Sequence, residues 1–436
     1  MSLINLKEIK HTGVYNAYDA ILTHLRAAAG PAGVSERELR ALETPERQVL
    51  LLNFPVTLDN GRVRSFEGFY VIHSTVAGAA RGGLLFAPDI TLHSIKALAA
   101  AMTWKAALAD IPFGGAKGGI LCHPDRLSEG EHSRLVQSYI QALSEVCNRN
   151  QSAPGQQVID WLTDEYSVLH GKSLAAVLGR DPLPSDKTGQ RMSATGYGVA
   201  VATQLAAAKK GYGPAGTTVA IQGFGNVGMR TAVCLYEKGF RILAAGDLHA
   251  AYYHPYGLDI HDLVAYRRYH KGSIKGYPHA VPVPPAELLT MNVDILIPAA
   301  RENVIPAALA PQINAGIIVE AANGPISPEA DRLLRGRNVL VIPDILANAG
   351  GMIVNYLDWM QNSLNETWKP GLVQTRLEER ITVNFNEVFL AAAAYQVSPR
   401  IAAYMIAMKR VAAKKLIAEA LRSAEKARAA AGRRKT

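Results

Sequence analysis

The strongest constraint on the fold of this chain is a glycine-rich turn between a strand-like segment and a helix-like segment. The apolar, β-branched run at 217–222 (TTVAIQ) predicts a strand, and the run at 229–239 (MRTAVCLYEKG) predicts a helix that ends on a glycine. The turn between them, 223–228 (GFGNVG), has the spacing G-x-G-x-x-G. A strand, a glycine turn and a helix in this order predict the start of a parallel βαβ unit.

Each glycine of this turn has a separate physical task. Gly223 permits the tight turn, Gly225 lets a ligand approach the backbone, and Gly228 lets the helix pack close to the strand. The start of the helix, at Asn226 and Val227, offers free N–H groups and the positive end of the helix dipole, which together favour a pyrophosphate. The segment therefore predicts a dinucleotide-binding site.

An acid stands where such a site binds a ribose. The second predicted strand (RILAAGD) ends at Asp247, about twenty-four residues after Gly223. A carboxylate there accepts a hydrogen bond from a ribose hydroxyl and repels a 2′-phosphate. We therefore expect NAD as the cofactor. NADP stays open as the alternative, because Arg241 or His249 can reach a 2′-phosphate.

Further apolar runs extend this unit into a sheet. The runs at 293–299, 316–322 and 338–343 lack the alternation of half-buried strands, as buried parallel strands do. With the helical runs between them, they predict a doubly wound α/β sheet of the Rossmann type over residues 191–350.

The regions on either side have different patterns. Residues 1–190 begin with a helical pattern and continue with a hairpin around Asp59-Asn60-Gly61, a strand at 82–86 and a helix capped by Thr91. We expect an N-terminal α/β domain there, for substrate binding and oligomerisation. Residues 351–436 predict helices that return to this domain and end in a basic tail.

Composition places the chain among globular proteins. Hydrophobic residues make up 49% and charged residues 19%, and no apolar run is long enough to cross a membrane. The N-terminal segment contains acids and lacks the apolar core of a secretory signal, so we expect a cytoplasmic protein. Cys122, Cys147 and Cys234 are far apart, which favours buried thiols over a disulfide framework or a zinc cluster.

Positive charge is concentrated at the C-terminus. Ten lysines and arginines but only two glutamates lie between Lys409 and Thr436, in a chain whose formal net charge is +9. Such a tail binds nucleic acid in some proteins. A solvated helix with a frayed basic end explains it better, because no aromatic residue follows Tyr404 to stack on a base.

Three cations gather around a second glycine-rich segment. Residues 111–119 (IPFGGAKGG) predict a loop that leads into a strand, with Lys117 between two glycine pairs. Lys105 lies near the end of the preceding predicted helix, and Arg81 precedes another glycine pair. Hydride transfer at a 2-amino acid requires a cation for the α-carboxylate and a proton-transfer group; a desolvated lysine suits the second task, because burial lowers its pKa toward roughly 7–8. Spacing alone explains these cations equally well as surface residues beside turns.

At these residues the sequence resembles a known family. The segment at 102–119 (MTWKAALADIPFGGAKGG) is similar to the substrate-binding segment of the glutamate/leucine/phenylalanine/valine dehydrogenases. The likeness covers most of the chain and is closer to the glutamate branch than to the shorter leucine and phenylalanine enzymes. Its other segments are SATGYGV (193–199), IQGFGNVG (221–228), IPAARENVI (297–305), EAANGPISPEA (320–330) and PDILANAGGMIVNYLDWMQN (343–362).

The resemblance implies roles for individual residues. Lys117 corresponds to the catalytic lysine and Lys105 to the ligand of the α-carboxylate. Arg81 and Asn355 stand where glutamate enzymes carry a lysine and a serine for the side-chain carboxylate. Besides the glycine turn, the implied cofactor contacts are Thr195 and Asn226, with Asn323 and Asn348 on the nicotinamide side. The family closes its cleft between two domains, its glutamate members are usually hexamers, and we expect no metal.

Three positions depart from the family pattern. Arg81 keeps the charge of the lysine but shifts a bound carboxylate, and Asn355 keeps the capacity to hydrogen-bond. The third is an aspartate that serves the lysine in proton transfer and that the family places about ten residues before the tryptophan of WxxDEYS. Here that tryptophan is Trp161 and the position is Gln151; neither Gln151 nor Asn150 ionises near neutral pH. Losing a general acid or base typically costs 10²–10⁴-fold in rate.

Three hypotheses remain open. The first is NAD(P)-dependent oxidative deamination of an amino acid, foremost of glutamate to 2-oxoglutarate and ammonium, by a homo-oligomer. The second is a regulatory or non-catalytic subunit of the glutamate dehydrogenase type, paired with a catalytic paralogue. The third is a dehydrogenase for another amino acid, with a reshaped pocket.

Overall fold

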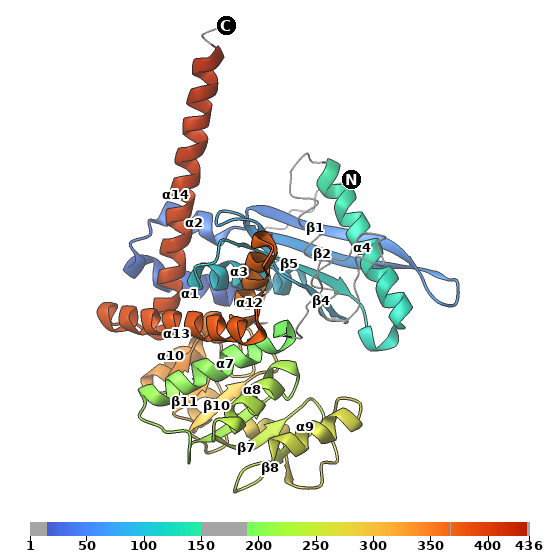
Figure 1. The fold of residues 1–436 in the computed structure, drawn as a ribbon, viewed down its shortest axis with the longest axis vertical. Coiled ribbons are helices and arrows are strands. Elements are labelled where there is room, and N and C mark those ends of the chain that lie inside the picture. The colour runs from blue at the N-terminus through green and yellow to red at the C-terminus, as the bar shows by residue number, and fades with distance from the viewer. Residues whose placement is uncertain (1–14, 150–189, 367, 434–436) are drawn as a thin grey trace.

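Two sheets and a set of long helices make up the molecule (Figure 1). The computed structural model describes residues 15–149, 190–366 and 368–433. Within these residues the N-terminal sheet lies in the upper half of Figure 1 and the second sheet in the lower half, with α13 (Pro370–Tyr395) running between them.

The N-terminal sheet contains the predicted hairpin. Its described strands follow the order β1-β2-β5-β3, and β4 also pairs with β5. Thr57 pairs with Val63 across the hairpin, and Gly61 in the turn has a φ of 78°, which confirms the predicted turn. The strands are β1 (Arg47–Thr57), β2 (Val63–Ser74), β3 (Ala80–Arg81), β4 (Leu84–Ala87) and β5 (Gly114–Leu121). The helices of this region are α1 (Ala17–Ala32), α2 (Glu36–Glu43), α3 (Leu92–Leu108) and α4 (Glu129–Arg149), with a 3-10 turn, η1, at Pro124–Arg126.

Helix α3 begins at the predicted cap. The Thr91 side chain accepts from the N–H of Ser94 at 3.1 Å, and the N–H of Thr91 donates to the Ser94 hydroxyl at 3.0 Å. This reciprocal pair satisfies two N–H groups at the helix start. Trp104 and Lys105, in the last turns of the helix, are buried.

One prediction for this region is wrong. Residues 114–119 are not a loop before a strand; they are part of strand β5 itself, which pairs with β2 on one side and with β3 and β4 on the other. A Cβ on Gly115 would overlap Thr103, and a Cβ on Gly119 would lie 2.5 Å from the Ile95 side chain. Both neighbours belong to α3. The strand is rich in glycine because the helix lies directly on it.

The second sheet confirms the predicted doubly wound fold. Its described strands follow the order β12-β11-β10-β6-β7-β8-β9; the first five are parallel, and β8 and β9 add antiparallel strands at one edge. The chain order reverses between β6 and β10, which places a ligand crevice at the carboxyl ends of these strands. The strands are β6 (Thr218–Gln222), β7 (Arg241–Gly246), β8 (Ala251–Tyr253), β9 (Val281–Val283), β10 (Ile295–Pro298), β11 (Ile317–Val319) and β12 (Leu340–Ile342).

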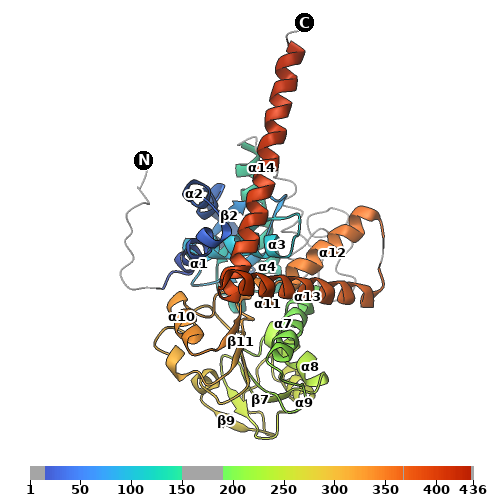
Figure 2. The ribbon, with the colours of Figure 1, turned by 90° about the vertical axis from the view of Figure 1, so that its left-hand side faces the viewer.

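Helices cover both faces of this sheet. Figure 2 shows α10 on one side and α7, α8 and α9 on the other. The helices are α7 (Gln190–Lys209), α8 (Asn226–Glu237), α9 (Ile260–Tyr269), α10 (Pro328–Gly336) and α11 (Asp344–Ala347), with 3-10 turns η2 (Pro285–Leu289) and η3 (Ala310–Gln312).

The C-terminal helices return to the N-terminal region, as predicted. Helix α12 (Gly350–Leu364) packs on α7 and α13, and α14 (Pro399–Arg433) packs on α1 and α3. The end of α14 then extends away from the rest of the molecule in both views (Figures 1 and 2).

Two remaining predictions concern thiols and membranes. Cys122 and Cys234 are buried free thiols, as predicted, whereas the Cys147 side chain lies outside the described residues. Within the described part of the chain, every helix is too short or too polar to serve as a membrane span.

Candidate active site

The glycine turn has the geometry that a pyrophosphate site requires. Gly223 has a φ of 103°, and a Cβ on it would lie 2.7 Å from the backbone of Ala299 and Ala300. A Cβ on Gly228 would overlap the carbonyl oxygen of Gly223, so α8 can approach β6 only through a glycine. A Cβ on Gly225, in contrast, would meet nothing within 4 Å among the described residues. The turn is thus closed toward the protein and open above the helix start.

The start of α8 is available to an anion. Gly225 is the N-cap residue and has no side chain to accept from the first-turn N–H groups. Gly225 and Asn226 are exposed, and Val227 is half-buried. Exposed N–H groups and the helix dipole together suit a phosphate, so these residues fit a dinucleotide.

Asp247 lies at the end of β7, beside this turn, but its carboxylate is already engaged. Oδ1 accepts from the N–H groups of His249 (2.7 Å) and Ala250 (2.9 Å). Oδ2 accepts from the Ser273 hydroxyl (3.0 Å) and the Ile274 N–H (2.8 Å). A carboxylate has about four lone-pair positions. A ribose hydroxyl would therefore have to replace one of these bonds, and Asp247 as a ribose ligand stays a prediction.

Lys105 and Lys117 meet between α3 and β5. Side chains alternate along a strand, so Lys117 shares the face of Gly115 and Gly119, which is the face covered by α3. Lys105 lies in the last turn of α3 and is only 6% exposed. Burial lowers the pKa of Lys105 to about 8; the positive charge of Lys117 contributes to this fall, and the negative charges of Asp344 and Glu320 oppose it. Lys105 is therefore not a surface cation.

Lys105 also reaches across to the second sheet. Its Nζ donates to Oδ1 of Asn323, in the segment after β11, at 2.5 Å. Asn348, at the end of α11, donates from Nδ2 to the same Oδ1 at 3.2 Å and to the Ala321 and Ala322 carbonyls. Two asparagines of the nucleotide side and a lysine of the N-terminal region thus form one hydrogen-bonded group.

Asn348 carries an acceptor that suits an amide ligand. Its Oδ1 is buried and has no hydrogen-bond partner among the described residues. Such an acceptor is costly unless a ligand or water satisfies it. Thr195 lies nearby, because a Cβ on Gly351, at the start of α12, would lie 2.8 Å from its Oγ1. These groups fit the carboxamide side of a nicotinamide.

An aromatic cluster connects Arg81 to the helix that carries Asn355. The guanidinium of Arg81 stacks on the Phe113 ring at 3.9 Å from its centroid. The same ring contacts Tyr356 and Trp359 edge-on, and both belong to α12, the helix of Asn355. Arg81 and Asn355 are half-buried. The stacking fixes the plane of the guanidinium, and Arg81 pairs with Gly115 of β5, two positions before Lys117.

The position of the family's aspartate is not described. Gln151 and Asn150 lie outside the described residues. Within the described ranges no group of three or more His, Cys, Asp or Glu side chains is arranged to hold a metal.

A buried charged group beside Lys105 and Asn323 was not predicted from the sequence. Glu320, Asp344 and Arg400 are all less than 7% exposed and are joined by ion pairs. Glu320 and Asp344 lie in segments already noted for their resemblance, EAANGP and PDILANAGG. The third member, Arg400, belongs to α14, and nothing in its local sequence marks it.

Models of known families match most of the chain. Residues 188–417 match the family described as Glutamate/Leucine/Phenylalanine/Valine dehydrogenase, and residues 45–168 match the Glu/Leu/Phe/Val dehydrogenase dimerisation domain. A glutamate dehydrogenase of Thermotoga maritima is 38% identical over 402 residues, which cover 91% of this chain and 96% of the relative. Glutamate dehydrogenase A2 of Halobacterium salinarum is 40% identical over 387 residues, which cover 87% and 92%.

Solved structures agree with the sequence relatives. The hetero-hexameric glutamate dehydrogenase of Thermus thermophilus, in its leucine-bound form, is similar with a TM-score of 0.80 and 31% identity, covering 92% of this chain and 96% of that one. The glutamate dehydrogenase of Peptoniphilus asaccharolyticus has a TM-score of 0.69 and 30% identity, covering 92% and 99%.

Proposed function

The chain belongs to the glutamate/leucine/phenylalanine/valine dehydrogenase family, and from this premise we propose that it interconverts glutamate with 2-oxoglutarate and ammonium. The family makes the chain an amino-acid dehydrogenase that uses a nicotinamide cofactor. One observation carries the choice of the site: Lys105 is buried beside Lys117 and bonds across to Asn323. Two cations at the junction of the two sheets suit an acidic substrate next to a dinucleotide.

The lysines divide the chemistry of the amino-acid centre. Lys105 binds the α-carboxylate. To do so, its Nζ gives up the hydrogen bond to the amide oxygen of Asn323 and donates to a substrate oxygen instead. Lys117, on the same face of the cleft, moves protons at the α-carbon's nitrogen and oxygen as the carbinolamine forms and collapses. A bound nicotinamide supplies or accepts the hydride. Gly225, Asn226, Val227 and Thr195 bind and orient the dinucleotide, and Asn348 offers its buried Oδ1 to the carboxamide.

We assign the choice of substrate to Arg81 and Asn355. Arg81 binds the side-chain carboxylate, and Asn355 adds a hydrogen bond. The stack on Phe113 supports this assignment because it fixes the plane of the guanidinium. Another amino acid is the alternative substrate, since the aromatic cluster lies beside Arg81.

NAD is the proposed cofactor and NADP the alternative. The negative charge of Asp247 at the end of β7 disfavours a 2′-phosphate. Two observations support NADP as the alternative cofactor. The oxygens of Asp247 already accept hydrogen bonds from the protein, and His249 is exposed beside it.

A homo-oligomer, hexameric as in the glutamate branch, is the proposed assembly. We assign residues 1–190 to the substrate and oligomerisation domain, 191–350 to the dinucleotide domain and 351–436 to the returning helices. Light scattering tests the assembly against the chain mass of 46.9 kDa. The cytoplasmic location stays a prediction.

A regulatory subunit is the second candidate. The observation in its favour is that the similar protein of Thermus thermophilus is hetero-hexameric. Glutamine at position 151, in place of an acid, motivates it as well.

Reductive amination by the purified protein tests the proposal. We expect ammonium-dependent oxidation of NADH with 2-oxoglutarate, and weaker oxidation with 2-oxoisocaproate or phenylpyruvate. NADPH is run in parallel, and Arg81→Ala should raise the KM for 2-oxoglutarate while leaving the apolar oxo acids unaffected. No turnover with any oxo acid would leave the regulatory role; a preference for an apolar oxo acid would change the substrate.

The pH profile tests the role of Lys105. Its pKa of about 8 means that the free enzyme carries the charge at neutral pH and loses it above pH 8. Since only the charged form attracts a carboxylate, kcat/KM for 2-oxoglutarate should fall about tenfold per pH unit on the alkaline side. A profile that stays flat to pH 10 would exclude Lys105 as the carboxylate ligand.

A further inference from the structure

Arg400 is the centre of a buried group of charges behind the cleft. It lies near the start of α14 and is 2% exposed. Its Nη1 and Nη2 donate to the two oxygens of Glu320, each at 2.8 Å, and its Nε donates to Asp331 at 2.9 Å. Burial raises the pKa of Glu320, and the bidentate pair with Arg400 opposes that effect.

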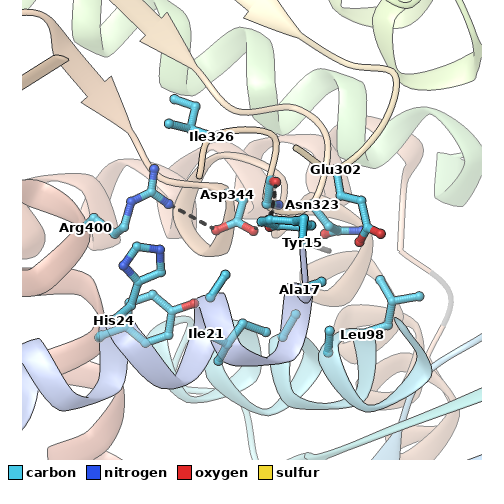
Figure 3. Close-up of a pocket in the computed structure, with 15 residues that line it drawn as sticks. Tyr15, Ala17, Ile21, His24, Leu98, Glu302, Asn323, Ile326, Asp344 and Arg400 are labelled. Carbon is cyan, nitrogen blue, oxygen red and sulfur yellow. Dashed lines mark hydrogen bonds and ion pairs between the residues drawn. The ribbon is translucent and has the colours of Figure 1, made fainter. Parts of the chain in front are cut away.

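Asp344 connects this group to the segment that carries Asn323. Its backbone N–H donates to Glu320 at 2.8 Å, and its Oδ2 accepts from the N–H of Gly324 at 2.9 Å. Arg400 faces Asp344 Oδ1 from 3.9 Å. Figure 3 shows Arg400 and Asp344 pointing toward each other, with Asn323 beside Asp344.

Hydrogen bonds from the two ends of the short helix α11 therefore fix both ends of the segment 321–324. Asp344, at its start, holds the N–H of Gly324, and Asn348, just after it, holds the carbonyls of Ala321 and Ala322. Asn323 lies between these points and receives Lys105. Its position is set by α11, and α11 is set by Arg400 through Glu320 and Asp344.

Stability alone is a weak explanation for these charges. Taking ions out of water costs several kcal/mol each, and well-packed apolar residues often do as well. The placement of these charges next to Lys105 offers a better explanation. Of the charged groups on described elements around α3, Asp344 and Glu320 favour the charged form of Lys105, whereas Lys117 opposes it.

We propose that Asp344 and Arg400 are positioning residues of the active site: Arg400 fixes Glu320 and Asp344, and Asp344 holds Asn323 against Lys105. Helix α14 thereby becomes part of the cleft, although it begins about fifty residues after Asn348. The inference rests on the proposed function only where turnover is the readout.

Asp344→Asn is the test and Asp331→Asn its matched control. Asp331 also pairs with Arg400, but it lies on α10 and makes no bond to residues 321–324 among the described contacts. We expect Asp344→Asn to lower kcat/KM for the oxo acid about 10- to 100-fold, mainly through KM, because small displacements in a cleft have costs of this size. Its alkaline limb should move to lower pH, since an acid that favours charged Lys105 is removed. Asp331→Asn should change kcat/KM less than about threefold, with no shift of the limb, because the charges that act on Lys105 are those of Asp344, Glu320 and Lys117.

A chemical readout separates this inference from the proposed function. Cyanate carbamylates neutral amines, so peptide mass spectrometry after treatment at a series of pH values measures the fraction of Lys105 that is neutral. The pH of half-modification should be lower in Asp344→Asn than in the wild type, and unchanged in Asp331→Asn. Glu320→Gln, which keeps the side-chain volume, should act in the same direction and replaces Asp344→Asn if the latter does not fold.

The outcomes are distinct. Equal effects of Asp344→Asn and Asp331→Asn, in kinetics or in labelling, would show that the buried charged group serves only the fold. Absence of wild-type turnover would remove the proposed function, and the labelling of Lys105 would still decide the inference.

Discussion

Asp247 illustrates how the surroundings of a single residue limit its chemistry. Burial acts to raise the pKa of its carboxyl, but the hydrogen bonds from Ile274, His249, Ala250 and Ser273 outweigh burial and lower it. The residue is charged at neutral pH and ties β7 to the loop at 273–274. Whatever selectivity it confers comes from its charge, since its lone pairs are used.

Asp247→Asn should therefore shift cofactor preference toward NADPH. A charge about 6 Å from a 2′-phosphate in a watery site is worth about 1 kcal/mol, or roughly fivefold to tenfold in the ratio of kcat/KM for NADPH over NADH. Ser273→Ala is the control, because it removes one hydrogen bond to Oδ2 and keeps the charge. An equal ratio in the two variants would mean that Asp247 serves only the fold.

At the scale of elements, the contact between β5 and α3 positions both lysines. Gly115 and Gly119 have no side chains to separate the helix from the strand, and Lys117 lies between them. The helix is correspondingly buried on several sides, with Ala99, Ala106 and Thr103 almost inaccessible. The catalytic assignment depends on this close packing.

Gly115→Ala should disturb the site as well as the fold. Its Cβ would overlap Thr103 and Ala99, including backbone atoms, so the helix must move. We expect a loss of about 3 kcal/mol of stability, measured by denaturation, and a fall in kcat/KM of at least tenfold. Gly371→Ala is the control: it lies near the start of α13 with nothing within 4 Å of its Cβ among the described residues, and should be neutral or slightly stabilising. Full activity in Gly115→Ala would contradict the assigned packing of Lys117.

At the scale of the whole molecule, α14 has two parts. Its first half packs on α1 and α3 and contributes Arg400 to the charged group, whereas its end extends beyond the body (Figure 1). The family match stops at residue 417. The contacts of Arg400 lie in the first half of this helix, and the family match ends near its middle.

Deletion of 422–436 should leave catalysis intact. The deleted segment carries six lysines and arginines and one glutamate, so the formal net charge falls from +9 to +4. We expect unchanged kcat, KM and oligomer mass, and both proteins should elute from immobilised DNA at 150 mM salt. Retention of the full chain alone would establish the nucleic-acid role that we consider weaker, and lost activity would show that the extension supports the body.

Features that depend only on neighbours along the chain could be predicted from the sequence. The turn at 223–228, the Asp59–Gly61 hairpin and the Thr91 cap were predictable because torsion angles, caps and apolar periodicity act over a few residues. Lys105, Lys117 and Arg81 were candidates because of the glycines around them, but only the resemblance gave them roles.

Features that depend on contacts between distant segments could not be predicted from the sequence. Residues 114–119 of β5 were predicted as a loop because their glycines are explained only by the helix that lies on them. The bond from Lys105 to Asn323 spans 218 positions, and the pair of Arg400 with Glu320 spans 80. Burial, pKa values and hydrogen-bond partners all depend on such contacts between distant segments. No local pattern encodes them, because the energy of a buried charge is set by what folding places around it.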